Sequence, residues 1–465
     1  MSRPATGAGL APAARAGRSP AAPLELRHAI AITVGASVGA GIFAAPSLVA
    51  ANVPSVGWMF LLWLAGGAIA FIGALCYAEL SSTYASQAGE YHFLSRAFGR
   101  GTALLYAWAR FSVITTGSIA LLGFVYGDYM SQLLPLGPYS AALHAALATV
   151  LLTAVNMRGL RQGAQAQTGL TLLVVAGLAL IIAAGLWLWL AAPATPAPVH
   201  PAASTQATSA SGLGLAMVFV LLTFGGWNDA AYLSADLRQR RSIVWALLLS
   251  VGFITALYLL VNWAYWQVLG LDGMARSHAV ATDTLVAAFG PAAGKLIAAM
   301  VAVAALTSMN ATLIVGARTA CALGDDWPPL RFLARWDAER HVPRHAMPVQ
   351  CVLALLLIAV GATFTSGFQA MVEYTAPVFW LFFLLVGVAL LRLRAADAGR
   401  ARPFRVPLYP LLPLLFCASS AGMLWASLSF VHSQQLGGFN AAWIGVAVLG
   451  SGALMLLGMR RRERC

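Results

Sequence analysis

Two short stretches rich in glycine interrupt otherwise apolar segments, and they carry most of the chemistry that this sequence offers. They are Gly35-Ala36-Ser37-Val38-Gly39-Ala40-Gly41-Ile42-Phe43 and Leu222-Thr223-Phe224-Gly225-Gly226-Trp227-Asn228-Asp229-Ala230-Ala231-Tyr232. Each glycine costs about 1 kcal/mol relative to alanine in a helix, so both stretches favour a break. Within a membrane, an unwound backbone survives only where it is buried in protein or lines a wet cavity. The small residues of the first stretch could also serve close packing of two helices, and that alternative stays open for the stretch alone.

A break in the middle of a helix exposes amide N–H groups on one side and carbonyl groups on the other. The N–H groups and the helix dipole favour a carboxylate, whereas free carbonyls favour an ammonium group. Such a site therefore matches both ends of a free α-amino acid without any charged side chain. A polyamine has no carboxylate and would need acidic side chains, but Asp229 is the only acid near either stretch.

The two stretches lie in a chain of apolar segments long enough to cross a membrane. The 465 residues are 60% hydrophobic and only 9% charged, a composition that excludes an ordinary soluble domain. The sequence predicts an all-α polytopic membrane protein with twelve spanning helices. They are expected at residues 28–50, 57–79, 101–129, 139–157, 166–191, 213–235, 243–270, 284–317, 348–366, 371–393, 405–431 and 439–459. The eighth is overlong, and a short helix that ends near Gly290-Pro291 is expected to precede the span.

The placement of arginine predicts which side of the membrane each loop faces, because cytoplasmic loops carry an excess of Lys and Arg. Tails and loops on one side carry 25 arginines, whereas the opposite loops carry only Arg276 and Lys295. Both termini are therefore predicted to be cytoplasmic. Residues 1–27 are expected to form a disordered cytoplasmic tail before a transporter domain over 28–460. The near absence of lysine fits a GC-rich bacterial gene, so the expected location is the bacterial cytoplasmic (inner) membrane.

The two interrupted segments are the first and the sixth, and an offset of five spans gives them opposite orientations. Interrupted helices at corresponding places of two inverted halves point to a binding site near the middle of the membrane. The sequence thus predicts one inverted repeat over 28–191, a second over 213–393, and two further helices within 405–459. This pairing favours a binding site at Gly35–Phe43 over simple helix packing.

Other functional classes receive little support. The formal net charge of +13 is spread over loops between apolar segments, so no nucleic acid is expected as a partner. The expected partners are the lipid bilayer and a small-molecule amino acid, and the oligomeric state is left open. The five cysteines are scattered without metal-ligand spacing, and the spans contain no HExxH or GxSxG motif. We therefore expect no catalytic residue, no metal and no cofactor. A channel would need a continuous polar stripe along several helices, which the spans lack.

Further motifs accompany the two interrupted stretches in a fixed order along the chain. They are Tyr77-Ala78-Glu79-Leu80 with Gly89-Glu90-Tyr91, Asn156-Met157-Arg158-Gly159, and Gly316-Ala317-Arg318 with Gly324-Asp325-Asp326. In this combination the chain resembles the amino acid–polyamine–organocation transporters, specifically the bacterial amino acid permeases, over roughly residues 28–410. The resemblance implies a five-plus-five inverted-repeat fold with discontinuous helices 1 and 6 and two additional C-terminal helices.

The resemblance also implies roles for backbone groups at the two breaks. The substrate carboxylate would be bound by the N–H groups of Ala40, Gly41 and Ile42. The substrate α-amino group would meet the carbonyls of Ser37, Val38, Phe224 and Gly225.

Two side chains after the second break match positions that commonly shape the site in this family. Trp227 is either part of that site or a core aromatic wedged beside two glycines. Asn228 is either a substrate ligand or a hydrogen-bonding residue between helices.

Two departures from the family pattern concern closure and coupling. Leu222 stands where many relatives carry an aromatic residue that closes over the substrate. Either Phe224 or Phe219 would serve instead, or the occluded state would be less tightly sealed. Val174 stands where proton-coupled relatives often carry a lysine. A proton mechanism centred on that lysine is therefore not expected, and exchange, facilitated uptake or coupling through another group stays open.

Two charged residues inside the spans are candidate gating groups, together with Leu222. Arg110 lies about ten residues into the third segment. It either extends to the cytoplasmic headgroups or pairs with Glu79 or Asp236 and holds an inner gate closed. Asp229 follows the second break, where it either lines the cytoplasmic half of the pathway or is simply hydrated.

These observations predict a secondary active transporter of amino acids, a permease or exchanger that works by alternating access, and not an enzyme. A polyamine or cationic amino-acid antiporter and a non-transporting amino-acid sensor are the alternatives. Segments 1, 2, 6 and 7 would rock against segments 3, 4, 8 and 9. Backbone groups recognise only the α-carbon end of an amino acid, so these stretches do not decide which amino acid is carried.

Overall fold

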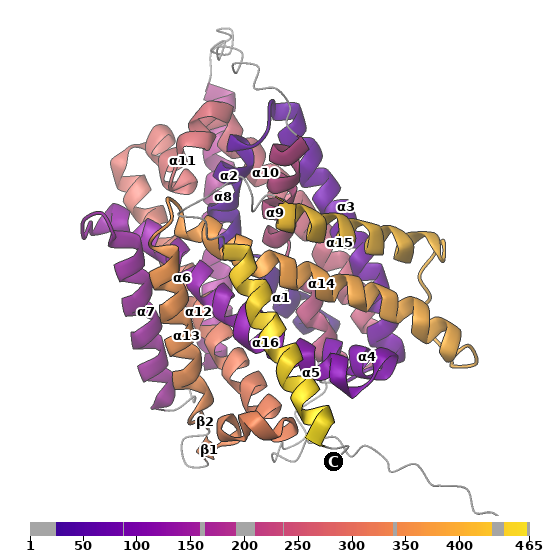
Figure 1. Cartoon of the computed structure of the whole chain (residues 1–465). Coiled ribbons are helices and arrows are strands. Elements are labelled where there is room, and N and C mark those ends of the chain that lie inside the picture. Colours follow the sequence, from indigo (N-terminus) through magenta and orange to yellow (C-terminus); the bar gives the residue numbers. More distant parts are fainter. Residues whose placement is uncertain are drawn as a thin grey trace, which may run out of the picture.

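The computed structural model describes residues 25–86, 88–158, 163–191, 210–235, 237–337, 342–429 and 441–462, which are mostly helical (Figure 1). The elements are α1 (Leu26–Ser37), η1 (Ala40–Phe43), α2 (Ala45–Ala51), α3 (Val56–Thr83), α4 (Gly89–Phe98), α5 (Arg100–Ala109), η2 (Arg110–Thr115), α6 (Thr116–Leu133), α7 (Ser140–Met157), α8 (Gly163–Ala191), α9 (Ala210–Thr223), η3 (Trp227–Leu233), α10 (Ser242–Arg276), α11 (Val280–Phe289), α12 (Pro291–Asp326), η4 (Pro328–Ala334), β1 (Trp336–Asp337), β2 (Val342–Pro343), α13 (Ala346–Gly361), α14 (Gly367–Ala396), α15 (Leu411–Ser429) and α16 (Ala441–Arg462). The two short strands form an antiparallel pair.

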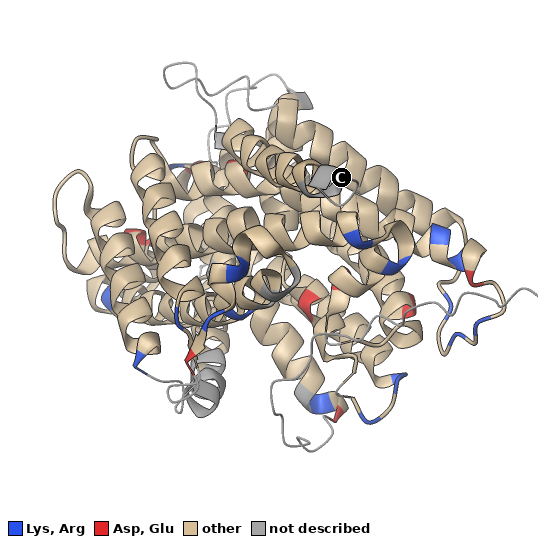
Figure 2. Ribbon diagram, turned by 60° about the horizontal axis from the view of Figure 1, so that its bottom comes forward, with Lys and Arg blue, Asp and Glu red and all other residues tan. Residues whose placement is uncertain are grey.

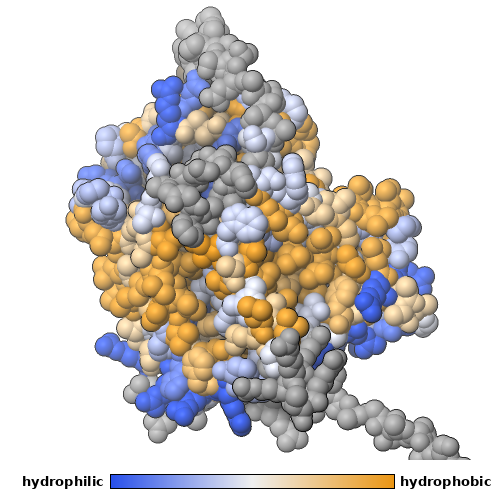
Figure 3. All heavy atoms as spheres, viewed as in Figure 1, coloured by the Kyte–Doolittle hydropathy of each residue, from blue (hydrophilic) through white to orange (hydrophobic). Residues whose placement is uncertain are grey.

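Nine helical stretches in the described ranges are long and apolar enough to cross a membrane. Three further predicted segments correspond to the interrupted α1–η1–α2, to α13 and to α16. Apolar side chains form a broad band around the middle of the molecule, with hydrophilic residues toward both ends (Figure 3). The all-α membrane class is thus confirmed, whereas the count of twelve spans and the repeat boundaries stay predictions.

Glycine and proline set the ends of several helices. The predicted break near Gly290-Pro291 is present, because Gly290 has φ +85° and Pro291 starts α12. A fixed proline φ suits the first turn of a helix, and glycine tolerates the left-handed region before it. In the same way Gly270, with φ +66°, kinks α10 near its end.

The third span contains a π-helical turn, η2, between α5 and α6. A π turn adds one residue to the helical repeat, and such turns are frequent at functional sites. Here the Tyr374 hydroxyl of α14 donates to the Ser112 carbonyl within the turn, at 3.0 Å. The turn begins at Arg110, the charged residue of this span.

The two interrupted segments lie side by side in the centre of the molecule. α1 packs against η3 and α10, and α2 packs against α9 and α10. The end of α16, the β1–β2 pair and α4 lie at the lower end of Figure 1, whereas α11 lies toward the opposite end. The third span, α5–η2–α6, can therefore touch both interrupted segments at different heights.

Candidate functional site

The first predicted break lies between α1 and η1. α1 ends at Ser37, Val38 leaves the helical region with ψ 72°, and Gly39 is extended with ψ −166°. The chain then makes a single 3-10 turn, Ala40–Phe43, before α2 begins with a proline in its first turn. Because 3-10 hydrogen bonds run between residues three apart, the first amides of this turn, those of Ala40 and Gly41, have no acceptor inside it.

The second predicted break lies between α9 and η3. α9 ends at Thr223, and Gly226 adopts φ +104° and ψ −27° before the 3-10 helix η3. Only glycine takes up this left-handed conformation at little cost. Both interruptions therefore occur where the glycine content of the sequence predicts them.

The two breaks meet through their backbones. A methyl group added to Gly226 would lie 2.5 Å from the Ala36 carbonyl oxygen, so the two chains approach as closely as glycine allows. At the other break, Gly41 faces Thr223, with the nearest atom 3.6 Å from an added methyl group. The Tyr258 hydroxyl lies 3.0 Å from the Ser37 carbonyl and 3.1 Å from the Thr223 carbonyl, and it donates its one hydrogen to either. Carbonyls of both breaks thus converge on one hydroxyl of α10.

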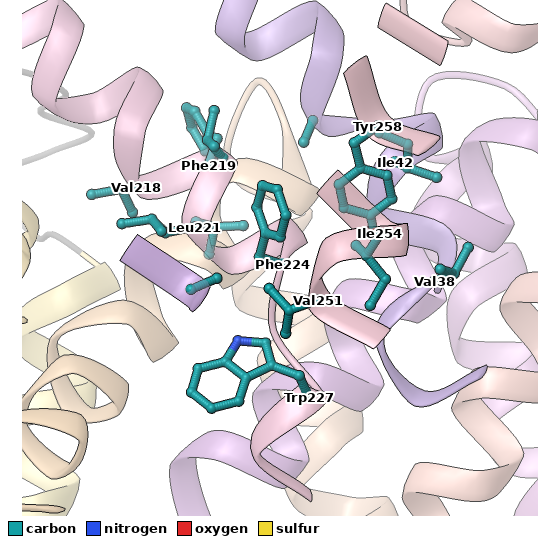
Figure 4. Close-up of a cluster of buried hydrophobic side chains, with 14 of the residues drawn as sticks. Val38, Ile42, Val218, Phe219, Leu221, Phe224, Trp227, Val251, Ile254 and Tyr258 are labelled. Carbon is teal, nitrogen blue, oxygen red and sulfur yellow. The ribbon is translucent and has the colours of Figure 1, made fainter. Parts of the chain in front are cut away.

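Apolar side chains enclose this junction (Figure 4). Val38 and Ile42 of the first break are buried beside Ile254 and Tyr258 of α10. The Phe224 ring lies 5.1 Å from the Tyr258 ring and 6.2 Å from the Trp63 ring. Burial excludes water and strengthens hydrogen bonds made to the exposed backbone groups.

The aromatic candidates for a closing side chain are packed inside the protein. Phe224 and Phe219 are each 1% exposed. Leu222, the residue at the family's aromatic position, is half-buried. Closure by Leu222, Phe224 or Phe219 stays a prediction.

Trp227 is packed in the core, as one of the two interpretations of the sequence expects, and its part in the substrate site stays a prediction. It is 2% exposed, and its ring lies 5.1 Å from the Tyr77 ring and 5.7 Å from the Phe383 ring. Gly73 of α3 makes room for the indole, since an added methyl group there would lie 2.9 Å from it. Trp227 therefore anchors η3 against α3 and α14.

Arg110 is the centre of a buried charged network. Its guanidinium lies 3.3 Å from Glu90 of α4 and 2.9 Å from Asp229 of η3, and it stacks 4.8 Å from the centre of the Tyr232 ring. The arginine side chain is 13% exposed, and the Glu90 carboxylate side chain is 4% exposed. We call the ion pairs of Arg110 with Glu90 and Asp229 the Arg110 latch, because they join three separate elements.

This geometry corrects two expectations for Arg110. Extension to the headgroups is wrong, because the guanidinium is turned inward onto two carboxylates. The acid Glu79 is the wrong partner, because it is bonded to Arg394 and Arg402 instead. The other suggested partner, Asp236, lies outside the described residues. Asp229, with a side chain 45% exposed, is a salt-bridge partner rather than merely hydrated.

The sequence did not predict Glu90 as a site residue. It pointed to Glu90 only as part of the family motif Gly89-Glu90-Tyr91. Its carboxylate accepts hydrogen bonds from Tyr77 at 2.6 Å and from Asn228 at 3.0 Å, and also from Tyr106. The Asn228 side-chain oxygen accepts from the Gly226 amide at 3.3 Å. Asn228 is therefore a hydrogen-bonding residue between elements, and its role as a substrate ligand stays a prediction. The one signal in the sequence was an acid in a short helix between two spans.

A second contact ties the other end of the third span to the first break. The Tyr129 hydroxyl of α6 donates to the Phe43 carbonyl at 2.8 Å and accepts from the Ala281 amide of α11 at 3.4 Å. The Tyr129 and Phe43 rings also make an edge contact at 6.4 Å. We call these contacts the Tyr129 latch. The third span thus holds the two interrupted segments at two heights, one at Arg110 and one at Tyr129.

Two uncharged residues, Val174 and Ser308, bear on ion coupling and on the first break, respectively. Val174 of α8 is 8% exposed and takes its place in the apolar core. Ser308 of α12 faces the first break, with its hydroxyl 3.9 Å from a methyl group added to Gly39. Across the described ranges, no three His, Cys, Asp or Glu side chains converge as metal ligands.

Comparison with known proteins accords with this geometry. The profile of the amino acid permease family matches residues 24–449. The mouse b(0,+)-type amino acid transporter 1 is 30% identical over 404 residues, which are 84% of this chain and 80% of the relative. The serine/threonine exchanger SteT of Bacillus subtilis is 25% identical over 409 residues, 87% of this chain and 91% of the relative. The mouse large neutral amino acids transporter small subunit 2 is 28% identical over 418 residues, 85% of this chain and 75% of the relative. Since the family profile covers most of its length, this chain belongs to the amino acid permease family.

Proposed function

We propose that this permease exchanges neutral α-amino acids, and that the paired breaks at Ser37–Ile42 and Phe224–Asn228 bind the substrate. The observation that carries the proposal is the backbone contact between the two breaks, with Gly226 against Ala36 and Gly41 against Thr223.

Each end of an amino acid has a complement at this junction. The amides of Ala40 and Gly41 open a 3-10 turn and provide donors for the substrate carboxylate. The carbonyls of Ser37 and Thr223 already converge on the Tyr258 hydroxyl. An incoming ammonium group would take the place of that hydroxyl hydrogen, because a charged donor makes the stronger hydrogen bond.

A substrate with an uncharged side chain fits the local charges best. Glu90 and Asp229 are the acids next to the breaks in the described part of the chain, and Arg110 engages both. A cationic side chain would therefore lack a free carboxylate. This disfavours the polyamine and cationic antiporter alternatives, and the names of the serine/threonine and large neutral amino acid relatives support the neutral class.

The two latches support alternating access. The Arg110 latch holds η3 to the third span, and the Tyr129 latch holds the first break to the other end of the same span. Opening a pathway to one side requires the release of one latch while the other stays closed. The apolar Val174 gives no support to lysine-centred proton coupling, and the name of the serine/threonine exchanger among the relatives supports exchange.

The orientation rests on the arginine asymmetry. We place both termini in the cytoplasm of a bacterium and the protein in its inner membrane. The Arg110 latch then closes the cytoplasmic side, because α4, which carries Glu90, lies at the same end of the molecule as the end of α16 (Figure 1).

Counterflow in proteoliposomes tests the proposal. The panel contains all common amino acids and putrescine. Vesicles loaded with an unlabelled neutral amino acid should accumulate labelled neutral amino acids, whereas arginine, lysine and putrescine should not exchange. Gly41→Leu should abolish counterflow, because the side chain would fill the space between Gly41 and Thr223. The matched control is Gly422→Leu, at a position where an added methyl group meets nothing within 4 Å.

Two results would contradict this proposal. Absence of exchange for every amino acid in the panel would remove the transport function. Normal uptake by folded, membrane-inserted Gly41→Leu would remove the binding site while leaving the transport function standing.

A further inference from the structure

A group of arginines gathers where α14 ends and the chain turns toward α15, on the right of Figure 2. Two of them, Arg394 and Arg402, form salt bridges inside the protein with Glu79 of α3, each at 3.2 Å from the same carboxylate oxygen. The other oxygen of Glu79 accepts the Val406 amide at 2.7 Å. Since Glu79 is fully buried, these bonds fix the loop 397–410 against the end of α3.

A second acid in the group, Asp397, is also engaged. It accepts the Tyr84 hydroxyl at 2.8 Å and pairs with Arg96 of α4 at 2.9 Å. The Tyr84 hydroxyl and the Arg96 guanidinium hold the pKa of Asp397 below its ordinary value. This carboxylate therefore stays ionised and bound within the group.

Three exposed arginines of the group form no salt bridge in the part of the chain that the structure describes, although Arg400 lies close enough to Asp397 to lower its pKa. Arg392 stacks 5.5 Å from the centre of the Phe98 ring, and Arg400 stacks 4.7 Å from that of the Tyr84 ring. Arg405 is exposed in the same loop, next to Val406, whose amide is bonded to Glu79. The group thus carries an uncompensated positive charge on a surface held in place by buried bonds.

An apolar surface adjoins these arginines. Leu408 is 70% exposed, Tyr409 is 42% exposed and Leu411 is 53% exposed. α15 begins at Leu411. Only 28% of its most apolar 18-residue stretch is buried inside the protein, the smallest share among the nine spanning stretches. Figure 3 shows apolar and hydrophilic atoms next to each other at this edge. Exposed aromatic and leucine side chains beside guanidinium groups are typical of residues at a lipid–water interface.

We propose that Arg392, Arg400 and Arg405 bind the headgroup of an anionic phospholipid, whose acyl chains lie along Leu408 and Leu411. Three exposed guanidinium groups that form no salt bridge match a headgroup that keeps a net negative charge, whereas a zwitterionic headgroup brings its own cation. Because loop 397–410 is tied to α3 through Glu79, a bound lipid also stabilises the end of that helix. The inference is independent of which substrate the permease carries.

The test measures lipid binding to the purified full-length protein in detergent by native mass spectrometry. The probes are phosphatidylglycerol and phosphatidylcholine at equal concentration. We expect a clear preference of the wild type for phosphatidylglycerol. The triple variant Arg392→Gln, Arg400→Gln, Arg405→Gln should lose it, since each guanidinium near an anionic lipid surface contributes a factor of about five.

The matched control removes three exposed arginines from another loop, with Arg238→Gln, Arg240→Gln and Arg241→Gln. This control variant should keep the preference for phosphatidylglycerol. Phosphatidylglycerol should also raise its thermal unfolding midpoint as much as it raises that of the wild type. An equal loss in both triple variants would overturn the proposal, because the effect would then follow from net charge alone. Unchanged binding by the first triple variant would overturn it as well.

A single change covers the case in which that triple variant does not fold. Arg405 makes no side-chain contact with an acid in the described ranges, so Arg405→Gln should fold normally. It should weaken phosphatidylglycerol binding about fivefold. Equal affinity of wild type and Arg405→Gln would refute the assignment of this residue.

Discussion

Removal of the Arg110 guanidinium is the sharpest test of the charged network at the centre of the protein. The change Arg110→Gln keeps a polar side chain of similar length but takes away the cation that faces Glu90 and Asp229. Glu90 would stay buried, with a side chain 4% exposed, and would keep its hydrogen bonds from Tyr77 and Asn228. Asp229, which is 45% exposed, would be hydrated instead.

The two ion pairs differ in strength because they differ in burial. At 3.3 Å and an effective dielectric constant of 20, the attraction between Arg110 and Glu90 is about 5 kcal/mol before desolvation. Removing one partner of such a buried pair costs about 3–5 kcal/mol, because the other charge is left uncompensated. The pair with Asp229 is partly screened by solvent, so Asp229→Asn should cost about 1 kcal/mol or less.

Thermal unfolding of four purified proteins measures this difference: wild type, Arg110→Gln, Glu90→Gln and the double variant. Each single variant should unfold at a clearly lower temperature than the wild type. The double variant should be more stable than the sum of the two single losses predicts, because it leaves no unpaired buried charge. Asp229→Asn serves as the matched control on the exposed side of the same guanidinium.

Two outcomes would refute this reasoning. One is an Arg110→Gln protein as stable as Asp229→Asn, which would mean that Glu90 is not held by charge. The other is strict additivity in the double variant, which would mean that the two residues do not interact.

Four other predictions concern the breaks and the loop after α14. Gly226→Ala should abolish counterflow and destabilise the protein by more than about 1–2 kcal/mol, because alanine is strained in the left-handed conformation and its methyl group would also clash with α1. The control Gly252→Ala, where an added methyl group meets nothing within 4 Å, should have neither effect. Tyr258→Phe should lower the free energy of unfolding by about 1 kcal/mol and change the substrate KM, and no change in either would contradict its place between the two breaks. Glu79→Gln should cost about 3–5 kcal/mol in unfolding experiments, because it leaves two guanidinium groups without a carboxylate. The lowered pKa of Asp397 means that its stabilising contribution is present above the ordinary carboxyl pKa of 3.8 and lost as the pH falls from there through the folded value. Wild type and Asp397→Asn should therefore converge in stability only in acid, as midpoints of thermal unfolding against pH would show.

The sequence predicted the two breaks because their cause is local. A left-handed backbone at Gly226 and a 3-10 turn at Ala40–Phe43 follow from glycine content, which any window of the chain reveals. The pairing of the two breaks also followed from the order of apolar segments along the chain. The class of fold and the family followed from the same features.

The partners of the charged residues could not be predicted in this way, because they depend on how distant elements pack. Glu79 and Glu90 both stand in family motifs, and nothing in their neighbours says which of them meets Arg110. The structure assigns Glu90 to Arg110 and Glu79 to Arg402, a residue more than 300 positions away along the chain. Trp227 is similar, since the space that receives it is left by Gly73 of another helix.

The unequal chemistry of the two latches has a consequence for the proposed transport cycle. The Arg110 latch joins a buried cation to two carboxylates, whereas the Tyr129 latch depends on neutral hydrogen bonds and one ring contact. A neutral hydrogen bond contributes about 1 kcal/mol net, and each difference of about 1.4 kcal/mol between the latches corresponds to a tenfold population ratio. The empty protein should therefore keep the Arg110 latch closed and open more readily at the Tyr129 latch. With the Arg110 latch on the cytoplasmic side, substrate from outside would meet a site that is already accessible to it, and its binding would have to supply the free energy that opens the other end.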